Sequence, residues 1–410
     1  MRAQRCKGTR DLSPEEMKAF RLIEGLFRES CLKWGYGEVR TPTLEYLHLF
    51  TSTGTLTPGR LGKVYSFLDW DGWSGERVVL RPDGTIPIAR LYIDTMSEKE
   101  LAKLFYISNV FIFEETGQET REKWQGGVEL IGAGSAAADV ELMILAREVL
   151  QKLGFKDIEL RLSHAGLIRE LLRRFKLSPE EQAVMFDQIL DGDVASLAKL
   201  KLDSPELGQA MVPLLNLKGK SAGFLQNMKT LLNHTLPELE THFDNFINIV
   251  DLLEALGCDY QIDIASGRGF EYYTGVMFQF LVGGEPVGGG GRYDALIPLL
   301  GGKDTPASGF ALYLDRLMNL LIPAMLAQPP ARRILIKANA ANEAFLVIGC
   351  LHDAGYAAEV DLGGPEPANL RWLLEVQDKT PIFTLTDRIK RKKFKAQNTD
   401  EVLALLKRGE

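Results

Sequence analysis

The feature that most constrains this chain is a long helical segment that lies between two strand-rich segments. From Ala165 to about Leu256 the apolar residues recur at helical spacing, and the capping pattern Ser-Pro-Glu-Glu at 178–181 marks a helix start inside this stretch. Strand patterns precede the stretch and resume at 260–264. This order is typical of a sheet domain with a helical insertion, so the sequence predicts an α+β fold with the insertion at about 165–256.

Shorter elements are predicted on both sides of the insertion. Ser13, Pro14 and Glu16 form a capping box, and the helical spacing that follows continues to Gly35. The other predicted elements are strands at 38–40, 77–80, 104–113 and 127–131, a helix at 139–153, a hairpin from 276–282 across Gly283-Gly284 to the residues after Glu285, and a helix at 312–321.

A second, smaller domain is predicted at the C-terminus. Gln328-Pro329-Pro330 indicates a linker at 326–332, which separates a core at 1–325 from residues 333–410. In the smaller part we predict strands at 334–336, 358–362 and 382–385, and helices at 343–353 and 368–376. Such alternation is typical of a small α/β domain.

Composition argues against several classes of protein. The net charge of −7 does not favour a general affinity for nucleic acid. The four cysteines are far apart and the five histidines lack metal-ligand spacing, so we expect neither disulfides nor a metal site. The N-terminus lacks the apolar core of a signal peptide, and no apolar run reaches the roughly 18 residues of a membrane span. We therefore expect a cytoplasmic protein.

Five motifs occur in a fixed order along the chain. They are Gly8–Asp11 with Val39–Pro42, then Leu80–Thr85, Arg268–Gly275, Gly289–Asp294 and Gly309–Arg316. Together they resemble the class II aminoacyl-tRNA synthetases of the histidyl type over nearly the whole chain. The resemblance implies a class II synthetase-like core of antiparallel sheet and helices that forms a homodimer through its first-motif region. It also implies that residues 333–410 are similar to an anticodon-binding domain.

The same resemblance implies a pocket for histidine. A free amino acid needs acceptors for its ammonium group and a cation for its carboxylate, and an imidazole needs partners for two nitrogens. The implied residues are Asp83, Thr85 and Gln125 at the ammonium, Arg268 and Gln125 at the carboxylate, and Glu129 with Tyr273 at the ring, with Tyr272 completing the set. The alternative is that Arg268 and Glu129 form an ordinary interior ion pair.

The nucleotide half of that site is degenerate in this sequence. Adenylate formation joins two anions, so the site must supply fixed positive charge. The synthetases place an arginine where Ile112 stands, and no Lys or Arg lies between Lys103 and Arg121 to replace it. Tyr313 stands where they keep a glycine beside the adenine, and Arg316 remains alone. We therefore expect synthetase activity to be lost, with no catalytic residue and no cofactor.

A more specific resemblance lies in the insertion and the last motif. Leu162–Leu172, Leu314–Leu317 and Asp83 are similar to the synthetase-like regulatory subunit of ATP phosphoribosyltransferase. No phosphoribosyl-pyrophosphate loop is recognisable in the chain. The resemblance implies a non-catalytic subunit in histidine biosynthesis that partners a short-form catalytic subunit, is required for its activity and carries allosteric feedback by histidine.

Two other functions remain open. A divergent but active histidyl-tRNA synthetase is one, and Ile112 argues against it. A pseudo-synthetase module that senses tRNA is the other: the basic cluster at 388–395 favours it, whereas the net acidity argues against it. We do not expect tRNA binding. Residues 132–137 match a loose dinucleotide fingerprint without the required frame, so we do not expect a dinucleotide there either.

Overall fold

The computed structural model divides the chain into two compact units, Met1–Leu326 and Ala327–Glu410. The linker predicted at 326–332 and the predicted site residue Arg268 lie outside the residues that the structure describes. The described residues are 3–53, 62, 64–69, 75–113, 120–173, 177–190, 218–232, 236–265, 272–321, 333–338, 341–364, 370–377 and 382–409.

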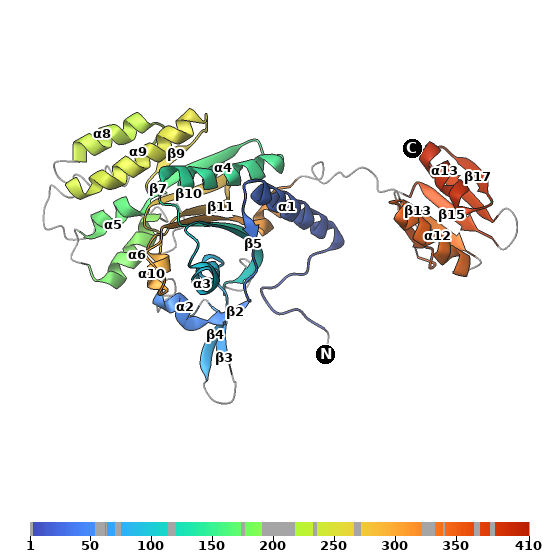
Figure 1. The fold of residues 1–410 in the computed structure, drawn as a ribbon, viewed down its shortest axis with the longest axis horizontal. Coiled ribbons are helices and arrows are strands. Elements are labelled where there is room, and N and C mark those ends of the chain that lie inside the picture. The colour runs from blue at the N-terminus through green and yellow to red at the C-terminus, as the bar shows by residue number, and fades with distance from the viewer. Residues whose placement is uncertain are drawn as a thin grey trace. The chain divides into compact units, whose positions relative to one another are not determined.

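A nine-stranded mixed sheet forms the body of the larger unit (Figure 1). In the sheet order given next, every pair of neighbouring strands between β5 and β7 is antiparallel. The strand β1 pairs with β5 in parallel, and β9 pairs with β7 in parallel. In sheet order the strands are β1 (Gly37–Glu38), β5 (Ala102–Phe111), β6 (Glu122–Ile131), β12 (Ala307–Tyr313), β11 (Glu285–Arg292), β10 (Val276–Val282), β7 (Ile158–His164), β9 (Gln261–Asp263) and β8 (Lys218–Gly219).

Helices cover both faces of this sheet. In Figure 1, α1 (Pro14–Lys33) and α4 (Ala136–Lys152) lie above it, and α3 (Thr85–Met96) and α10 (Leu296–Leu299) lie below it. The predicted capping box opens α1: the Ser13 hydroxyl accepts from the Glu16 N–H at 3.2 Å, and the Glu16 carboxylate accepts from the Ser13 N–H at 2.7 Å. The apolar face of α1 is buried in the core, as its helical spacing predicted.

The predicted helical segment contains α5 (Ala165–Arg173), α6 (Pro179–Leu190), α8 (Ala222–Leu232), the 3-10 turn η3 (Pro237–Leu239) and α9 (Glu240–Ala255), together with the short strand β8. His164, at the end of β7, is buried where α9 meets the sheet. Its ring centroid lies 5.3 Å from that of His242 on α9. Burial lowers the pKa of His164 to about 3, so the ring is neutral and belongs to the core.

The predicted hairpin at Gly283-Gly284 is confirmed, whereas the helix predicted at 312–321 was too long. Gly283 and Gly284 have φ of 59° and 83°, as a type I′ turn requires, and Val282 pairs with Glu285. Leu312 and Tyr313 belong to β12, and helix α11 covers only Leu314–Leu320. The pairing of β12 with β6 places Tyr313 opposite Gln125, so the correction moves a predicted site residue onto the sheet.

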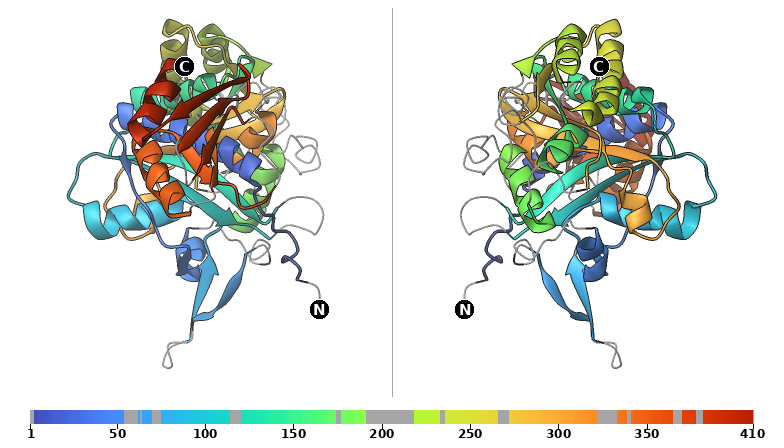
Figure 2. Two further views of the ribbon diagram at one scale, coloured as in Figure 1. Left: turned by 90° about the vertical axis from the view of Figure 1, so that its right-hand side faces the viewer. Right: turned by 90° about the vertical axis from the view of Figure 1, so that its left-hand side faces the viewer.

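A small three-stranded sheet projects from the body of the larger unit (Figures 1 and 2). It consists of β2 (Leu44–Tyr46), β4 (Glu76–Leu80) and β3 (Ser66–Asp69), and α2 (Leu47–Ser52) follows β2 directly. The central strand β4 leads into the Leu80–Thr85 loop, so this sheet anchors the loop that carries the predicted site residues Asp83 and Thr85.

The smaller unit is a five-stranded sheet with α12 (Ala341–Asp353) and α13 (Thr399–Gly409) packed on one face (Figure 2). The helix predicted at 368–376 was wrong where the structure describes it. Trp372–Val376 form a strand because Trp372, Leu374 and Val376 alternate into the core. In sheet order the strands are β14 (Ala357–Val360), β13 (Arg333–Ala338), β15 (Trp372–Val376), β16 (Phe383–Asp387) and β17 (Lys392–Ala396).

The basic cluster at 388–395 occupies the β16–β17 hairpin. The buried carboxylate of Asp387 accepts from the N–H groups of Ile389 and Lys390, at 3.0 Å each, and so holds the turn. Lys392 and Lys393 lie exposed on β17, which is the edge strand of this sheet. Exposed lysines on an edge strand are a common protection against pairing with other chains.

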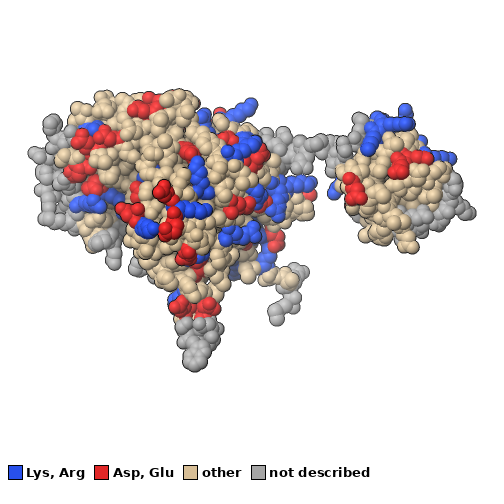
Figure 3. Space-filling model, in the orientation of Figure 1, with Lys and Arg blue, Asp and Glu red and all other residues tan. Residues whose placement is uncertain are grey.

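Within the described ranges, no helix is long and apolar enough to cross a membrane. Acidic and basic side chains are interspersed over the face of the larger unit that Figure 3 shows.

Candidate ligand-binding site

A cavity of about 40 Å³ lies between the sheet and the loop that precedes α3. Five residues predicted for the histidine pocket line it: Asp83, Thr85, Gln125, Tyr272 and Tyr273. The wall is completed by residues that the pocket prediction did not include, among them Tyr106, Phe278, Tyr293, Gly309 and Tyr313, the last of which was predicted for the nucleotide half.

A buried arginine fixes the loop that carries Asp83. The Arg81 guanidinium donates to the carbonyls of Thr41, Pro42 and Asn109 at 2.9, 3.0 and 2.8 Å. These bonds tie the loop to the first motif and to β5. The position of Asp83 is therefore fixed by the protein's own contacts.

Asp83 has two partners and a shifted pKa. One carboxylate oxygen accepts from the N–H of Ile86, in the first turn of α3, at 2.8 Å, and the other accepts from the Tyr272 hydroxyl at 3.2 Å. Burial raises the pKa of Asp83 to about 6, although these two bonds oppose the shift. The group is therefore ionised at pH 7 and can pair with a cation in the cavity.

Glu129 lies on β6 behind the cavity wall rather than on it. Its Oε1 accepts from the Thr85 hydroxyl at 2.8 Å, and its Oε2 accepts from the Tyr293 hydroxyl. The side chain is buried, and a Cβ at Gly309 would lie 2.0 Å from Oε2. Burial raises the pKa of Glu129 to about 8, with a further contribution from Asp83. Direct contact of Glu129 with a ligand ring stays a prediction.

Two glycines admit the ring of Tyr106, a residue that the sequence analysis missed. A Cβ at Gly84 would lie 2.2 Å from the Tyr106 hydroxyl oxygen, and one at Gly127 would lie 2.2 Å from its Cζ. The same hydroxyl accepts from Gln125 Nε2 at 3.1 Å and so orients that amide. Tyr106 lies inside a predicted strand, and nothing in that pattern set it apart from its neighbours.

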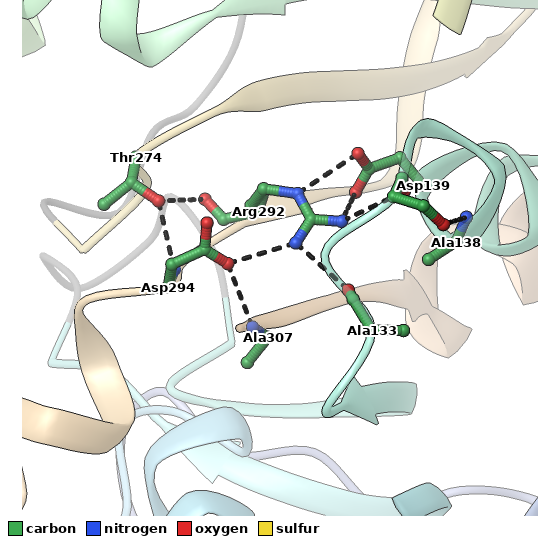
Figure 4. Close-up of polar contacts among 8 residues, drawn as sticks. Ala133, Ala138, Asp139, Thr274, Arg292, Asp294 and Ala307 are labelled. Atoms are coloured by element: carbon green, nitrogen blue, oxygen red, sulfur yellow. Dashed lines mark hydrogen bonds and ion pairs between the residues drawn. The ribbon is translucent and has the colours of Figure 1, made fainter. Parts of the chain in front are cut away.

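Arg292 holds the segments on which the cavity tyrosines lie (Figure 4). Its Nε and Nη2 bind the two carboxylate oxygens of Asp139 at 3.1 and 2.8 Å, and its Nη1 binds the Ala133 carbonyl and the Asp294 carboxylate at 3.1 Å each. The Arg292 carbonyl accepts from the Thr274 N–H at 2.8 Å. These contacts fix Tyr293 on one side and the end of the Tyr272-Tyr273 segment on the other.

The loop with the dinucleotide fingerprint belongs to this Arg292 network. The Ser135 carbonyl accepts from Arg292 at 3.4 Å, and the Ser135 side chain caps α4. The Gly132 N–H donates to the Pro306 carbonyl at 2.7 Å. The glycine-rich loop is therefore a partly exposed connection that backbone contacts tie to the Arg292 network.

The residues predicted for the degenerate nucleotide half, Ile112, Tyr313 and Arg316, make contacts within the protein. The Ile112 N–H donates to the Arg121 carbonyl at 2.9 Å, and the Arg121 guanidinium stacks on Phe113 at 4.0 Å. Tyr313 lines the cavity, and Arg316 lies beside its ring and donates to the Pro286 carbonyl at 2.9 Å. Of the described residues that line the cavity, none is Lys or Arg.

Comparison with known proteins identifies the family. A relative from Dehalococcoides mccartyi, named ATP phosphoribosyltransferase regulatory subunit, is 52% identical over 404 residues, which are 98% of this chain and 98% of the relative. The chain belongs to this family. A crystal structure of an ATP phosphoribosyltransferase regulatory subunit/histidyl-tRNA synthetase from Bacillus halodurans has a TM-score of 0.74 and 26% identity, covering 89% of this chain and 94% of that one.

The wider family is that of the histidyl-tRNA synthetases. A family model described as histidyl-tRNA synthetase matches residues 8–317. The histidine–tRNA ligase of Methanosarcina acetivorans is 34% identical over 82% of this chain and 79% of its own length. The apo histidyl-tRNA synthetase of S. aureus, at 20% identity and a TM-score of 0.67, shares the fold over 99% of this chain and 100% of that one. The predicted class II synthetase-like fold is confirmed.

The described residues contain no group of three or more His, Cys, Asp and Glu side chains that could hold a metal ion.

Proposed function

We propose that this protein is the regulatory subunit of an ATP phosphoribosyltransferase, that it does not itself catalyse, and that a separate short catalytic chain needs it for activity. The observation that carries the proposal is a cavity with an acid, hydroxyls and aromatic rings on its wall and, among the described residues that line it, no Lys or Arg to bind a phosphate. The relatives' name supports the same function, since this chain and the Dehalococcoides relative match over 98% of both lengths.

Histidine is the proposed ligand of the cavity. Asp83 is an ionised acid on the wall, and the ammonium group of an amino acid is the cation that it can bind. The rings of Tyr272, Tyr273 and Tyr293, which pack edge to face, supply aromatic surface for an imidazole. Gln125, held by Tyr106, can donate to the carboxylate. The assignment of Arg268 to that carboxylate remains a proposal from the family resemblance.

We further propose that synthetase activity is lost. Attack of a carboxylate on the α-phosphate of ATP needs positive charge around both anions. Ile112 cannot supply it, and Arg316 is directed to a backbone carbonyl. The Tyr313 ring stands in the cavity where an adenine would need space. A site that keeps its amino-acid half without its nucleotide half suits a sensor.

The proposed regulation needs two sites and two states of the complex. Histidine would inhibit if it bound this subunit more tightly in the inhibited assembly than in the active one, because that difference in affinity is the coupling free energy. A homodimer through the first-motif region, joined to the short catalytic chains, is the assembly that we propose.

The test is reconstitution. Purified short catalytic chain is assayed for phosphoribosyl transfer to ATP alone, with this protein, and with this protein plus histidine. We expect little activity alone, activation by this protein, and inhibition by histidine. The variant Asp83→Asn, whose amide oxygen can still accept from the Ile86 N–H, should activate but lose much of the response to histidine. Asp94→Asn, at the exposed end of the same helix, is the matched control.

The result that would overturn the proposal is histidine-dependent pyrophosphate exchange or aminoacylation by this protein alone, with no effect on the transferase. That outcome would favour the active synthetase. Binding of uncharged tRNA with no effect on the transferase would favour the tRNA-sensing module instead.

A further inference from the structure

Two hydroxyl groups connect the Glu129 carboxyl group to the polar wall of the cavity. The hydroxyls of Thr85 and Tyr293, which both line the cavity, bond to its two carboxylate oxygens. The same wall holds the Tyr272 hydroxyl, which donates to Asp83, and the Tyr106 hydroxyl, which accepts from Gln125. The carboxyl group of Glu129 is thus connected to the wall by the hydroxyls of Thr85 and Tyr293, each of which can turn its proton.

The protonation state of Glu129 determines which hydrogen-bond donors and acceptors this wall presents to a ligand. An ionised carboxylate only accepts, so Thr85 and Tyr293 both donate to it and present lone pairs toward the cavity. A protonated Glu129 must donate its proton to one of the two hydroxyls. That hydroxyl then becomes free to turn its own proton toward the cavity. The wall therefore offers two acceptors in one state, and one donor with one acceptor in the other.

The two protonation states of an imidazole ring present the complementary sets of donors and acceptors. Imidazolium carries two N–H donors, and neutral imidazole carries one donor and one acceptor. Ionised Glu129 matches imidazolium, and protonated Glu129 matches the neutral ring. Taking histidine as the ligand, as proposed above, we infer that its imidazole and Glu129 together hold one titratable proton. The hydroxyls of Thr85 and Tyr293 lie between them and present the donors and acceptors that fit each state of the ring. Glu129 is then a positioning residue that acts through these two hydroxyls.

The inference predicts a maximum in the dependence of affinity on pH. The ring of free histidine has an ordinary pKa near 6.5, and burial raises the pKa of Glu129 to about 8. Below this window a protonated Glu129 faces imidazolium, and above it an ionised Glu129 faces a neutral ring. Each mismatch costs about tenfold in affinity for each pH unit beyond the corresponding pKa.

Other groups face Glu129 from each element packed around it. The Asp83 carboxylate adds to the acid side of the profile, since its pKa is about 6. Burial raises the pKa of each nearby tyrosine well above 10, so those hydroxyls stay neutral across the window. Among the described residues these groups are Asp83 and Thr85 at α3, Tyr106 on β5, Tyr272 and Tyr273 before β10, Tyr293 after β11 and Tyr36 after α1, whereas β12 contributes Gly309.

Calorimetric titration with histidine from pH 5.5 to 9, in buffers of different ionisation enthalpy, tests the inference. The decisive variant is Glu129→Gln, because an amide is permanently one donor and one acceptor and so mimics protonated Glu129. Glu159→Gln, on β7 beside Arg161, is the matched control. The amino group of histidine titrates identically for all three proteins and cancels in the comparison.

Between pH 7 and 9 the wild type and the control should lose about tenfold more affinity than Glu129→Gln does. Equal profiles for all three proteins would overturn the inference and leave histidine binding intact. No histidine binding to the wild type at any pH would overturn both the inference and the proposed ligand.

A second ligand keeps the test decisive if Glu129→Gln fails to fold. 1,2,4-Triazolyl-alanine has a ring that stays neutral over this pH range. Its affinity for the wild type should fall at alkaline pH as much as that of histidine does. Near pH 5.5 its affinity should fall about tenfold less than that of histidine. Identical acid limbs for the two ligands would overturn the inference.

Discussion

Replacing Glu129 with glutamine should stabilise the ligand-free protein, and the gain should grow as the pH rises. In the unfolded chain a glutamate has a pKa near 4.3, whereas burial raises the folded value to about 8. The folded state therefore holds a proton that the unfolded state releases, and this costs stability at every pH above about 4.3. The cost is roughly 1 kcal/mol at pH 5, roughly 3 to 4 kcal/mol at pH 7, and nearly constant above pH 8.

Glutamine removes this cost and still fills the buried site that the Glu129 side chain occupies. Its oxygen can accept from one of the two hydroxyls of Thr85 and Tyr293, and its amide can donate to the other. The gain would be a trade of stability against function, which is common at ligand sites.

Urea denaturation of the full chain at pH 5, 7 and 8.5 measures this gain. The relevant transition is that of the larger unit, which added histidine should shift to higher urea because it binds the folded state. Glu159→Gln should show no such gain. A Glu129→Gln protein that is less stable than the wild type at pH 7, or whose advantage does not increase with pH, would refute the reasoning.

Three further changes have expected outcomes. His164→Asn keeps an acceptor for the Leu167 N–H but cannot be charged. Because the folded pKa of His164 is about 3, the wild type should lose about 1.4 kcal/mol of unfolding free energy relative to the variant between pH 7.5 and 5.5. A difference in urea midpoint between the two proteins that is the same at both pH values would contradict this. Arg292→Ala leaves Asp139 buried without its partner and should destabilise the larger unit by about 3 to 5 kcal/mol, part of which the double variant with Asp139→Asn should recover in the same assay. Gly309→Ala would place a Cβ 2.0 Å from Glu129 Oε2 and should abolish histidine binding by calorimetry, so an unchanged affinity would count against the described geometry.

Local signals in the sequence predicted much of the larger unit correctly. The capping box at Ser13 and the glycine pair at 283–284 determine short-range geometry by themselves, and both are found as predicted. The helix expected at 312–321 shows the limit of such signals. Leu312 and Tyr313 are apolar enough for either element. Their pairing with β6, about 190 residues away in sequence, and the pairing of Leu312 with Gly288 on β11 select the strand.

The error at 368–376 has a similar cause. Trp372, Leu374 and Val376 alternate as a strand, but the run is short and its apolar residues also fit one face of a helix. The strand is selected because β13 and β16 flank it on both sides. The pairing with β13 joins residues that are far apart in sequence, and a single sequence does not reveal it.

The candidate site was predicted by family resemblance better than by residue pattern. Asp83, Thr85 and Gln125 come together on the cavity wall, although they are distributed over a loop, a helix and a strand. Tyr106 and Tyr293 were missed as members of the wall. Their importance depends on Gly84 and Gly127 making room for one ring, and on Glu129 binding the other hydroxyl, which are facts of packing rather than of sequence.

The most direct test of the account is calorimetric titration of the purified protein with histidine and, separately, with ATP. The account predicts that histidine binds, that ATP does not bind, and that Asp83→Asn weakens histidine while Asp94→Asn does not. Binding of ATP as well as histidine, followed by pyrophosphate exchange, would contradict it, because the nucleotide half would then work despite Ile112 and Tyr313.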